Sequence, residues 1–93
     1  MNMYKVVLVD DEELIIEGMK QLVDWESLGC RIEGAAYDGD EALDIINETE
    51  PDIIITDIRM PSMNGLEMID HVKDQFAEVV LMIMIRYGVF EYA

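Results

Sequence analysis

Four runs of mainly apolar residues alternate with three stretches of helical periodicity along the chain. The runs lie at residues 4–9, 30–36, 53–56 and 79–85. Unbroken apolar runs of this length are typical of strands buried on both faces, as in parallel sheets covered by helices. Strands that alternate with helices imply right-handed crossovers between neighbouring parallel strands. The pattern therefore predicts an α/β fold built on a doubly wound parallel sheet.

The predicted helices are marked by apolar stripes and capping residues. In the first helix the apolar residues recur at spacings of three and four, namely Leu14, Ile15, Gly18, Met19, Leu22 and Val23. Asp38 and Glu41 have the spacing of a capping box for a second helix, expected to run to about Asn47. Asn64 and Glu67 repeat this spacing before a third helix. Between the first helix and the second run, residues 24–29 predict a turn.

Length and composition indicate one small domain. The chain has 93 residues, of which 52% are hydrophobic, enough for a single core. Its only cysteine, Cys30, has no partner for an internal disulfide, and the first residues do not resemble a signal peptide. The longest apolar run has seven residues, far fewer than the roughly 20 that span a bilayer. We therefore expect a cytoplasmic protein without a membrane segment.

The chain is strongly acidic. Twenty-one Asp and Glu residues against six Lys and Arg residues give a formal charge of -15. This charge repels phosphate backbones and anionic membrane surfaces, so we expect no nucleic-acid contacts from this segment. An acidic excess usually forms a solvated surface that maintains solubility. The alternative is that some of the carboxylates converge on a cation.

Three aspartates follow predicted strands directly. Asp10 and Asp11 come after the first run, and Asp57 comes after the third. In open α/β sheets, ligands bind outside the carboxyl ends of the strands, where the strand order reverses. If the first and third strands are neighbours, three carboxylates share one small volume, and Mg²⁺ would offset their repulsion. A carboxylate beside Mg²⁺ is also able to attack phosphorus and form an acyl phosphate.

These motifs resemble the receiver domain of two-component response regulators. The resemblance is carried by residues 7–12, 38–43 and, most specifically, 52–67. Residues 24–30 and 90–93 are similar to the subgroup whose receivers precede an AraC-type DNA-binding domain. The resemblance covers essentially the whole chain, so residues 1–93 are identified as one receiver domain, expected to lack most of the family's fourth helix, its fifth strand and its fifth helix.

The resemblance implies a flavodoxin-like sheet of order 2-1-3-4-5 and a phosphoacceptor domain rather than an enzyme that turns over a substrate. It implies that Asp57 accepts a phosphoryl group from a histidine kinase and that the output is regulation of transcription. Asp10, Asp11, Asp57 and the backbone carbonyl of Arg59 are the implied Mg²⁺ ligands. DNA binding would belong to a downstream domain.

The chain departs from the family pattern near its end. Ile85 stands where receivers place a Ser or Thr, Arg86 stands at the following small position, and the last lysine is Lys73. These departures are expected to slow phosphorylation and to uncouple it from a conformational switch. The sequence also ends before the family's fifth strand and helix, so the expected order is 2-1-3-4. Exposure of the first helix's apolar residues and an open fourth-strand edge would favour homodimers.

Two other functions remain open at this point. One is a receiver-like interaction or dimerisation module that is not productively phosphorylated. The other is a hydrolase of the haloacid dehalogenase type, although that family needs a second Asp where Arg59 stands. His71 is expected on the surface, and Cys30 is expected to be a packed thiol. The methionines are expected to fill gaps in the core, including Met68, Met82 and Met84.

Overall fold

The computed structural model describes residues 3–57, 65–75 and 78–84. The elements in chain order are β1 (Tyr4–Val9), α1 (Glu13–Leu22), the 3₁₀ helix η1 (Glu26–Leu28), β2 (Cys30–Ala36), α2 (Gly39–Thr49), β3 (Ile53–Asp57), α3 (Gly65–Gln75) and β4 (Val80–Met84). All four predicted strands and all three predicted helices are therefore present. The strand edges agree with the prediction to within about one residue, which is the usual uncertainty of such boundaries.

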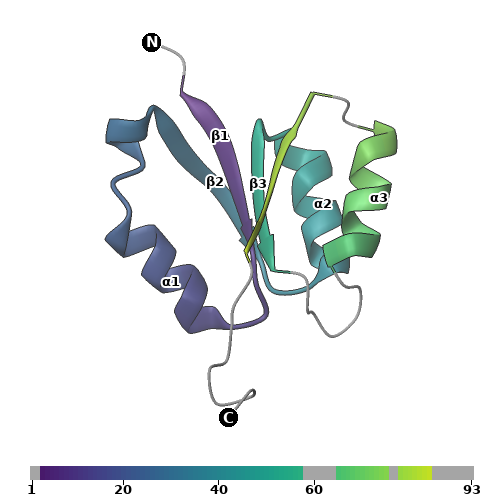
Figure 1. Ribbon diagram of the computed structural model, residues 1–93, viewed down its shortest axis with the longest axis horizontal. Coiled ribbons are helices and arrows are strands. Elements are labelled where there is room, and N and C mark those ends of the chain that lie inside the picture. The colour runs from purple at the N-terminus through teal and green to yellow at the C-terminus, as the bar shows by residue number, and fades with distance from the viewer. Residues whose placement is uncertain (1–2, 58–64, 76–77, 85–93) are drawn as a thin grey trace.

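The four strands form one parallel sheet of order β2-β1-β3-β4, as predicted. Helix α1 covers one face of the sheet, and α2 and α3 cover the other (Figure 1). The order reverses at β1, because the chain leaves β1 for β2 on one side and later returns to place β3 on the other. This is the flavodoxin-like arrangement, in which ligands bind outside the carboxyl ends of the strands at the reversal, here β1 and β3.

The core consists of two layers, one on each face of the sheet. Alternate residues of β1 contribute to each layer: Val7 and Val9 face α2 and α3, whereas Val6 and Leu8 face α1. The layer under α2 and α3 also contains Ile54, Ile46, Met68, Val72 and other buried residues. The layer under α1 is smaller, and its buried residues are Val6, Leu8, Ile16 and Ile55. The period of two along β1 is the expected result of its burial on both faces.

Helix α1 does not bury the stripe that its sequence predicts. Leu14 is 84% exposed and Leu22 is 87% exposed, whereas Ile16 is completely buried. Leu14 and Leu22 lie eight residues apart and so share a row along the flank of the helix. Ile16 and Met19 lie on the side that packs against the sheet. The contact face is thus rotated from the predicted one. The expected exposure of apolar residues on this helix is confirmed for Leu14 and Leu22, whereas Ile15 and Met19 are half-buried.

Local hydrogen bonds hold the helix ends where the sequence places them. Asp38 Oδ1 accepts the Glu41 N–H at 2.8 Å, and Glu41 Oε1 accepts the Tyr37 N–H at 3.0 Å. The predicted capping box is therefore present, although its return bond goes to the residue before the cap. The Trp25 indole N–H donates to the Met19 carbonyl at 2.9 Å. Trp25 thus packs over the end of α1, as predicted.

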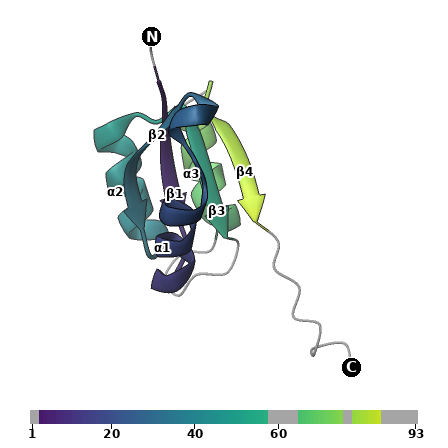
Figure 2. The same cartoon turned by 90° about the vertical axis from the view of Figure 1, so that its left-hand side faces the viewer.

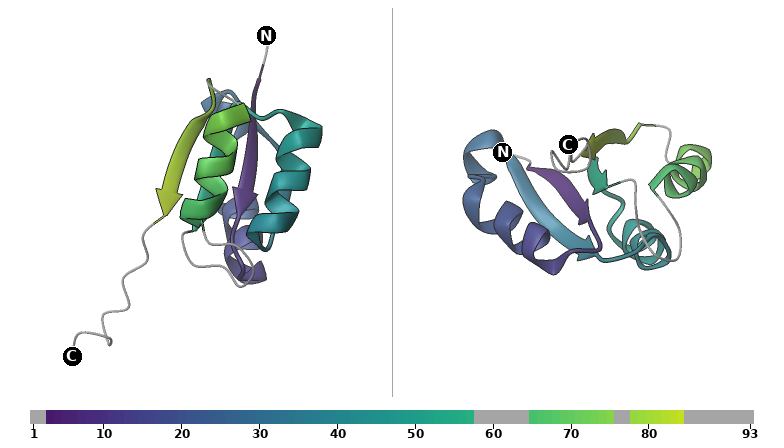
Figure 3. Two further views of the ribbon diagram at one scale, coloured as in Figure 1. Left: turned by 90° about the vertical axis from the view of Figure 1, so that its right-hand side faces the viewer. Right: turned by 60° about the horizontal axis from the view of Figure 1, so that its bottom comes forward.

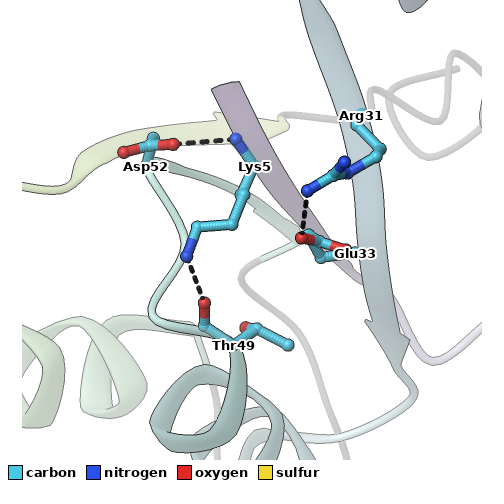
Figure 4. Close-up of polar contacts among 5 residues, drawn as sticks. All are labelled: Lys5, Arg31, Glu33, Thr49 and Asp52. Carbon is cyan, nitrogen blue, oxygen red and sulfur yellow. Dashed lines mark hydrogen bonds and ion pairs between the residues drawn. The ribbon is translucent and has the colours of Figure 1, made fainter. Parts of the chain in front are cut away.

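The amino end of the sheet is joined by a compact polar network (Figure 4). The Lys5 N–H donates to Asp52 Oδ2 at 2.8 Å, and the Asp52 N–H donates to the Lys5 carbonyl at 2.9 Å. The Asp52 carbonyl accepts the Val80 N–H at 2.9 Å. Lys5 Nζ also donates to the Thr49 carbonyl at 2.8 Å, in the last turn of α2. One aspartate and one lysine therefore connect β1, the start of β3, the start of β4 and the end of α2.

The predictions for individual side chains give a mixed result. Met68 is buried as predicted, but the core-filling role predicted for Met82 is wrong, because Met82 is 52% exposed. His71 is exposed as predicted, and Cys30 packs partly buried against the α1 layer. Asn64, Ile85 and Arg86 lie outside the described residues. Among the described residues, every helix is too short or too polar to cross a membrane.

Candidate functional site: an acidic cluster at the carboxyl end of the sheet

Three aspartates meet at the carboxyl ends of the two central strands. Asp57 is the last residue of β3, and Asp10 and Asp11 directly follow β1. Val9 is paired with Thr56, so Asp10 and Asp57 occupy the next positions on neighbouring strands. One carboxylate oxygen from each of Asp10, Asp11 and Asp57 lies within 4.8 Å of the others. The parallel pairing of β1 with β3 thus produces the cluster that the sequence predicts.

The cluster has a buried floor and an open rim. Asp10 is completely buried and Asp57 is 5% exposed, whereas Asp11 is exposed to solvent. A group that approaches from solvent would therefore meet Asp11 first and the two buried carboxylates behind it. Buried carboxylates are rare in proteins unless they are paired, hydrogen-bonded or bound to a metal. Their burial makes the cluster a better site candidate than an acidic surface patch.

Backbone groups fix the positions of the two buried aspartates. Asp10 Oδ1 accepts the Glu12 N–H at 2.9 Å, and the Asp10 N–H donates to the Ala36 carbonyl at 3.0 Å. The first bond forms a turn of the type that Asp side chains favour, and α1 begins immediately after it. Asp10 is therefore held on one side by β2 and on the other by the start of α1.

Thr56 adds a constraint that the sequence analysis missed. Its side chain is completely buried, and its hydroxyl donates to the Asp57 carbonyl at 2.8 Å. This bond fixes the backbone at the point where the chain leaves β3. The available signal was a single polar residue directly after three consecutive isoleucines in a buried strand.

The donor set suits a hard divalent cation. Carboxylate oxygens are the ligands that Mg²⁺ prefers, and it usually keeps several waters in its coordination shell. Two oxygens on opposite sides of one Mg²⁺ lie about 4.2 Å apart, because each bond is about 2.1 Å long. A cluster within 4.8 Å is close to this scale, so direct and water-mediated ligation both fit. The exposed side at Asp11 leaves room for the waters.

Asp10, Asp11 and Asp57 are thus brought together, whereas the further predicted ligand, the Arg59 carbonyl, lies outside the described residues. Ile85 and Arg86, the two residues at which the sequence analysis expects a departure from the family pattern, also lie outside them. Within residues 3–57, 65–75 and 78–84, this acidic trio is the group with metal-ligand spacing. The geometry therefore concerns the aspartates alone.

Comparison with known proteins gives a consistent picture. A family model described as the response regulator receiver domain matches residues 6–91. The uncharacterized transcriptional regulatory protein YesN of Bacillus subtilis is 44% identical over 91 residues. That alignment covers 98% of this chain but only 25% of YesN. The chain thus spans about a quarter of the length of this relative.

Solved structures agree with the sequence comparison. The REC domain of AraT, a response regulator from Geobacillus stearothermophilus, superposes with a TM-score of 0.88 at 29% identity, covering 99% of this chain and 70% of that one. A two-component transcriptional regulator AraC from Clostridium phytofermentans superposes with a TM-score of 0.85 at 30% identity, covering 96% of this chain and 69% of that one. Both resemblances extend over nearly all of the present chain.

Proposed function

The chain belongs to the response regulator receiver domain family, and from this premise we propose that it accepts a phosphoryl group on Asp57 in a Mg²⁺-dependent reaction with a sensor histidine kinase. The observation that carries the proposal is the convergence of three carboxylates within 4.8 Å at the carboxyl ends of β1 and β3. Receiver domains are regulatory phosphoacceptors rather than enzymes that turn over a substrate. The family match leaves the haloacid dehalogenase alternative without support.

In this proposal the three aspartates have different tasks. An Asp57 carboxylate oxygen forms the new bond to phosphorus while the bond from phosphorus to the donor nitrogen breaks. Asp10, Asp11 and Asp57, together with the Arg59 carbonyl, would hold Mg²⁺, which would supply positive charge against the phosphoryl oxygens. The Glu12 N–H keeps Asp10 oriented for this role. Thr56 fixes the backbone of the nucleophile through the Asp57 carbonyl.

The proposed output is regulation of transcription in the cytoplasm. The relative YesN is a transcriptional regulatory protein, and most of its length lies outside the region matched by this chain. DNA contacts are therefore assigned to sequence outside this segment, whose charge of -15 repels a phosphate backbone. The role assigned to residues 1–93 is to receive the signal.

Intact-mass spectrometry with acetyl phosphate and Mg²⁺ tests the proposal directly. The expected result is a mass increase of one phosphoryl group that requires Mg²⁺ and disappears in Asp57→Asn. A matched control is Asp44→Asn, because Asp44 is an exposed aspartate on α2, away from the cluster. The control should be labelled like the original chain. An unlabelled original chain, or labelling that persists in Asp57→Asn, contradicts the proposal.

A second candidate is an interaction module that associates without productive phosphorylation. It is favoured by the exposed apolar residues of β4, which are Val80, Met82 and Ile83. This candidate predicts self-association that is indifferent to the phosphodonor. A dimerisation constant that changes when acetyl phosphate is added would count against it.

A further inference from the structure

One side chain of α2 makes a hydrogen bond outside its own helix. In the usual capping box, the Glu at the third helical position accepts the N–H of the cap residue itself. Here Glu41 Oε1 accepts the N–H of Tyr37, the residue before the cap Asp38, at 3.0 Å. The Tyr37 N–H is not among the amide groups that the start of a helix leaves without an intrahelical partner. The Glu41 carboxylate therefore supports the turn between β2 and α2.

The Tyr37 N–H shares its peptide group with a carbonyl that binds the acidic cluster. This carbonyl belongs to Ala36, and it accepts the Asp10 N–H at 3.0 Å. In a trans peptide the carbonyl and the N–H point in opposite directions, so Glu41 and Asp10 bind opposite sides of one planar unit. Glu41 is exposed, whereas Ala36 and Asp10 are completely buried. Two hydrogen bonds thus connect a surface carboxylate to a buried member of the cluster.

The order of the elements keeps this connection short. Asp10 lies one residue beyond Val9 and Ala36, the last pair between β1 and β2. Helix α2 begins at Gly39, soon after β2 ends at Ala36. The first turn of α2 therefore lies at the same end of the sheet as the carboxyl ends of the strands (Figures 2 and 3). A side chain in this turn is able to act on Asp10 through a single peptide group.

We propose that Glu41 is a positioning residue for the cation site and holds Asp10 in place through the peptide group between Ala36 and Tyr37. The inference rests on the cation site of the proposed function and adds to it a residue from outside the acidic cluster. A carboxylate is a stronger acceptor than a neutral group, and hydrogen bonds in a chain polarise one another. The bond from Tyr37 to Glu41 therefore makes the Ala36 carbonyl a better acceptor for the Asp10 N–H.

Asp10 is then held at two points. The Ala36 carbonyl fixes its backbone N–H, and the Glu12 N–H fixes its carboxylate at Oδ1. Groups that orient a metal ligand tune the affinity for the metal, and the loss of such a group typically costs roughly 10- to 100-fold. Glu41 acts on the ligand through a peptide group and from an exposed position, so its loss should have a smaller effect.

Titration of the 93-residue chain with MgCl₂, followed by NMR at the amides of Asp10 and Asp11, tests the proposal. Glu41→Ala should raise the dissociation constant for Mg²⁺ by about three- to tenfold. Glu41→Gln keeps an acceptor oxygen for the Tyr37 N–H and should recover most of the affinity. Rescue by glutamine separates the hydrogen bond of Glu41 from its charge.

Two neighbours of Glu41 provide matched controls. Asp38→Ala removes the acceptor of the Glu41 N–H and so weakens the helix cap, but it leaves the Glu41 side chain in place. Asp40→Ala removes one exposed negative charge from the same turn and touches neither of the two hydrogen bonds. Both controls should bind Mg²⁺ within about twofold of the original chain, because exposed charges are screened by salt.

Hydrogen exchange in Mg²⁺-free buffer measures the same connection without a cation. The Asp10 amide should exchange about three- to tenfold faster in Glu41→Ala than in the original chain, because its acceptor is weakened. The comparison with Asp38→Ala separates this effect from a general loss of stability, since Asp38→Ala also weakens the start of α2. This measurement does not require phosphorylation of Asp57.

Several results would overturn the proposal. An unchanged Mg²⁺ affinity in Glu41→Ala, or an equal loss in Asp38→Ala, means that Glu41 only caps α2. A loss in Glu41→Gln as large as that in Glu41→Ala means that its charge acts on the cation instead. Unchanged exchange of the Asp10 amide in Glu41→Ala means that the two hydrogen bonds are not coupled. An original chain that binds no Mg²⁺ at Asp10 and Asp11 contradicts the proposed function itself, and this inference with it.

Discussion

The two ends of the sheet use aspartate in opposite ways. At the amino end, Asp52 accepts and donates hydrogen bonds with its carboxylate, carbonyl and amide groups, and Lys5 lies beside it. At the carboxyl end, Asp10, Asp11 and Asp57 place three like charges within 4.8 Å. The first arrangement stabilises the fold, whereas the second brings like charges together, and a bound cation would offset their repulsion. The comparison separates the aspartates that hold the sheet together from those that serve the proposed chemistry.

The largest expected contrast is in phosphorylation. Asp57→Asn should abolish labelling by acetyl phosphate, whereas Asp52→Asn should be labelled like the original chain. Removing one of three clustered charges should leave the free energy of unfolding in Mg²⁺-free buffer unchanged or raise it. Urea unfolding monitored by circular dichroism measures this quantity. A large loss of stability in Asp57→Asn would show that the cluster holds the fold as well.

Mg²⁺ should stabilise the chain through the carboxyl end alone. A ligand present at one hundred times its dissociation constant stabilises the folded state by about 2.7 kcal/mol. Thermal unfolding with and without Mg²⁺ should show this increase in the original chain and a smaller one in Asp11→Asn. Asp52→Ala should respond to Mg²⁺ as fully as the original chain does. An equal response in all three proteins would point to binding elsewhere.

At the amino end, Asp52→Ala should lower the free energy of unfolding by about 1 kcal/mol, because it removes the acceptor of the Lys5 N–H. The effect is modest because this bond is exposed to solvent. Asp52→Asn keeps a side-chain oxygen and should lose less. Urea titration measures both variants. A loss of phosphorylation in a folded Asp52→Ala protein would contradict the assignment of a purely structural role to Asp52.

A smaller effect sharpens the comparison, since one aspartate at the carboxyl end is structural. Asp38 follows β2 and caps α2 through the Glu41 N–H. Asp38→Ala should cost about 1 kcal/mol or somewhat less, the usual loss for an N-cap. The neighbouring Asp40→Ala serves as the control, because Asp40 is exposed and lies within the first turn. Asp38→Ala should not change the response to Mg²⁺.

Much of the fold follows from local patterns in the sequence. The two central strands, β1 and β3, are runs of mainly β-branched and other apolar residues, so burial on both faces leaves them little choice of structure. The position of Asp10, Asp11 and Asp57 follows from the strand ends and from the reversal of order, which is a property of the topology. These features depend on short segments and on one general rule, and for this reason the sequence predicts them.

The features that were missed depend on tertiary packing. The rotation of α1 is set by the contacts of Ile16 and Met19 with the sheet, and the periodicity of the helix does not reveal which flank makes them. Met82 looks like a core residue in sequence, but its exposure depends on what lies beyond β4. The hydrogen bond of Thr56 to the Asp57 carbonyl requires a local backbone geometry that no spacing rule encodes.

Trp25 gives the molecule a built-in optical reporter of one face. It is the only tryptophan in the chain, and its indole donates to the Met19 carbonyl at the end of α1 while packing against the α1 layer. Its emission therefore reports on the environment of α1 and not on that of α2 or α3. A fluorescence transition that precedes the loss of circular dichroism would reveal detachment of α1 before global unfolding. Trp25 fluorescence therefore reports on the smaller of the two core layers, the one under α1.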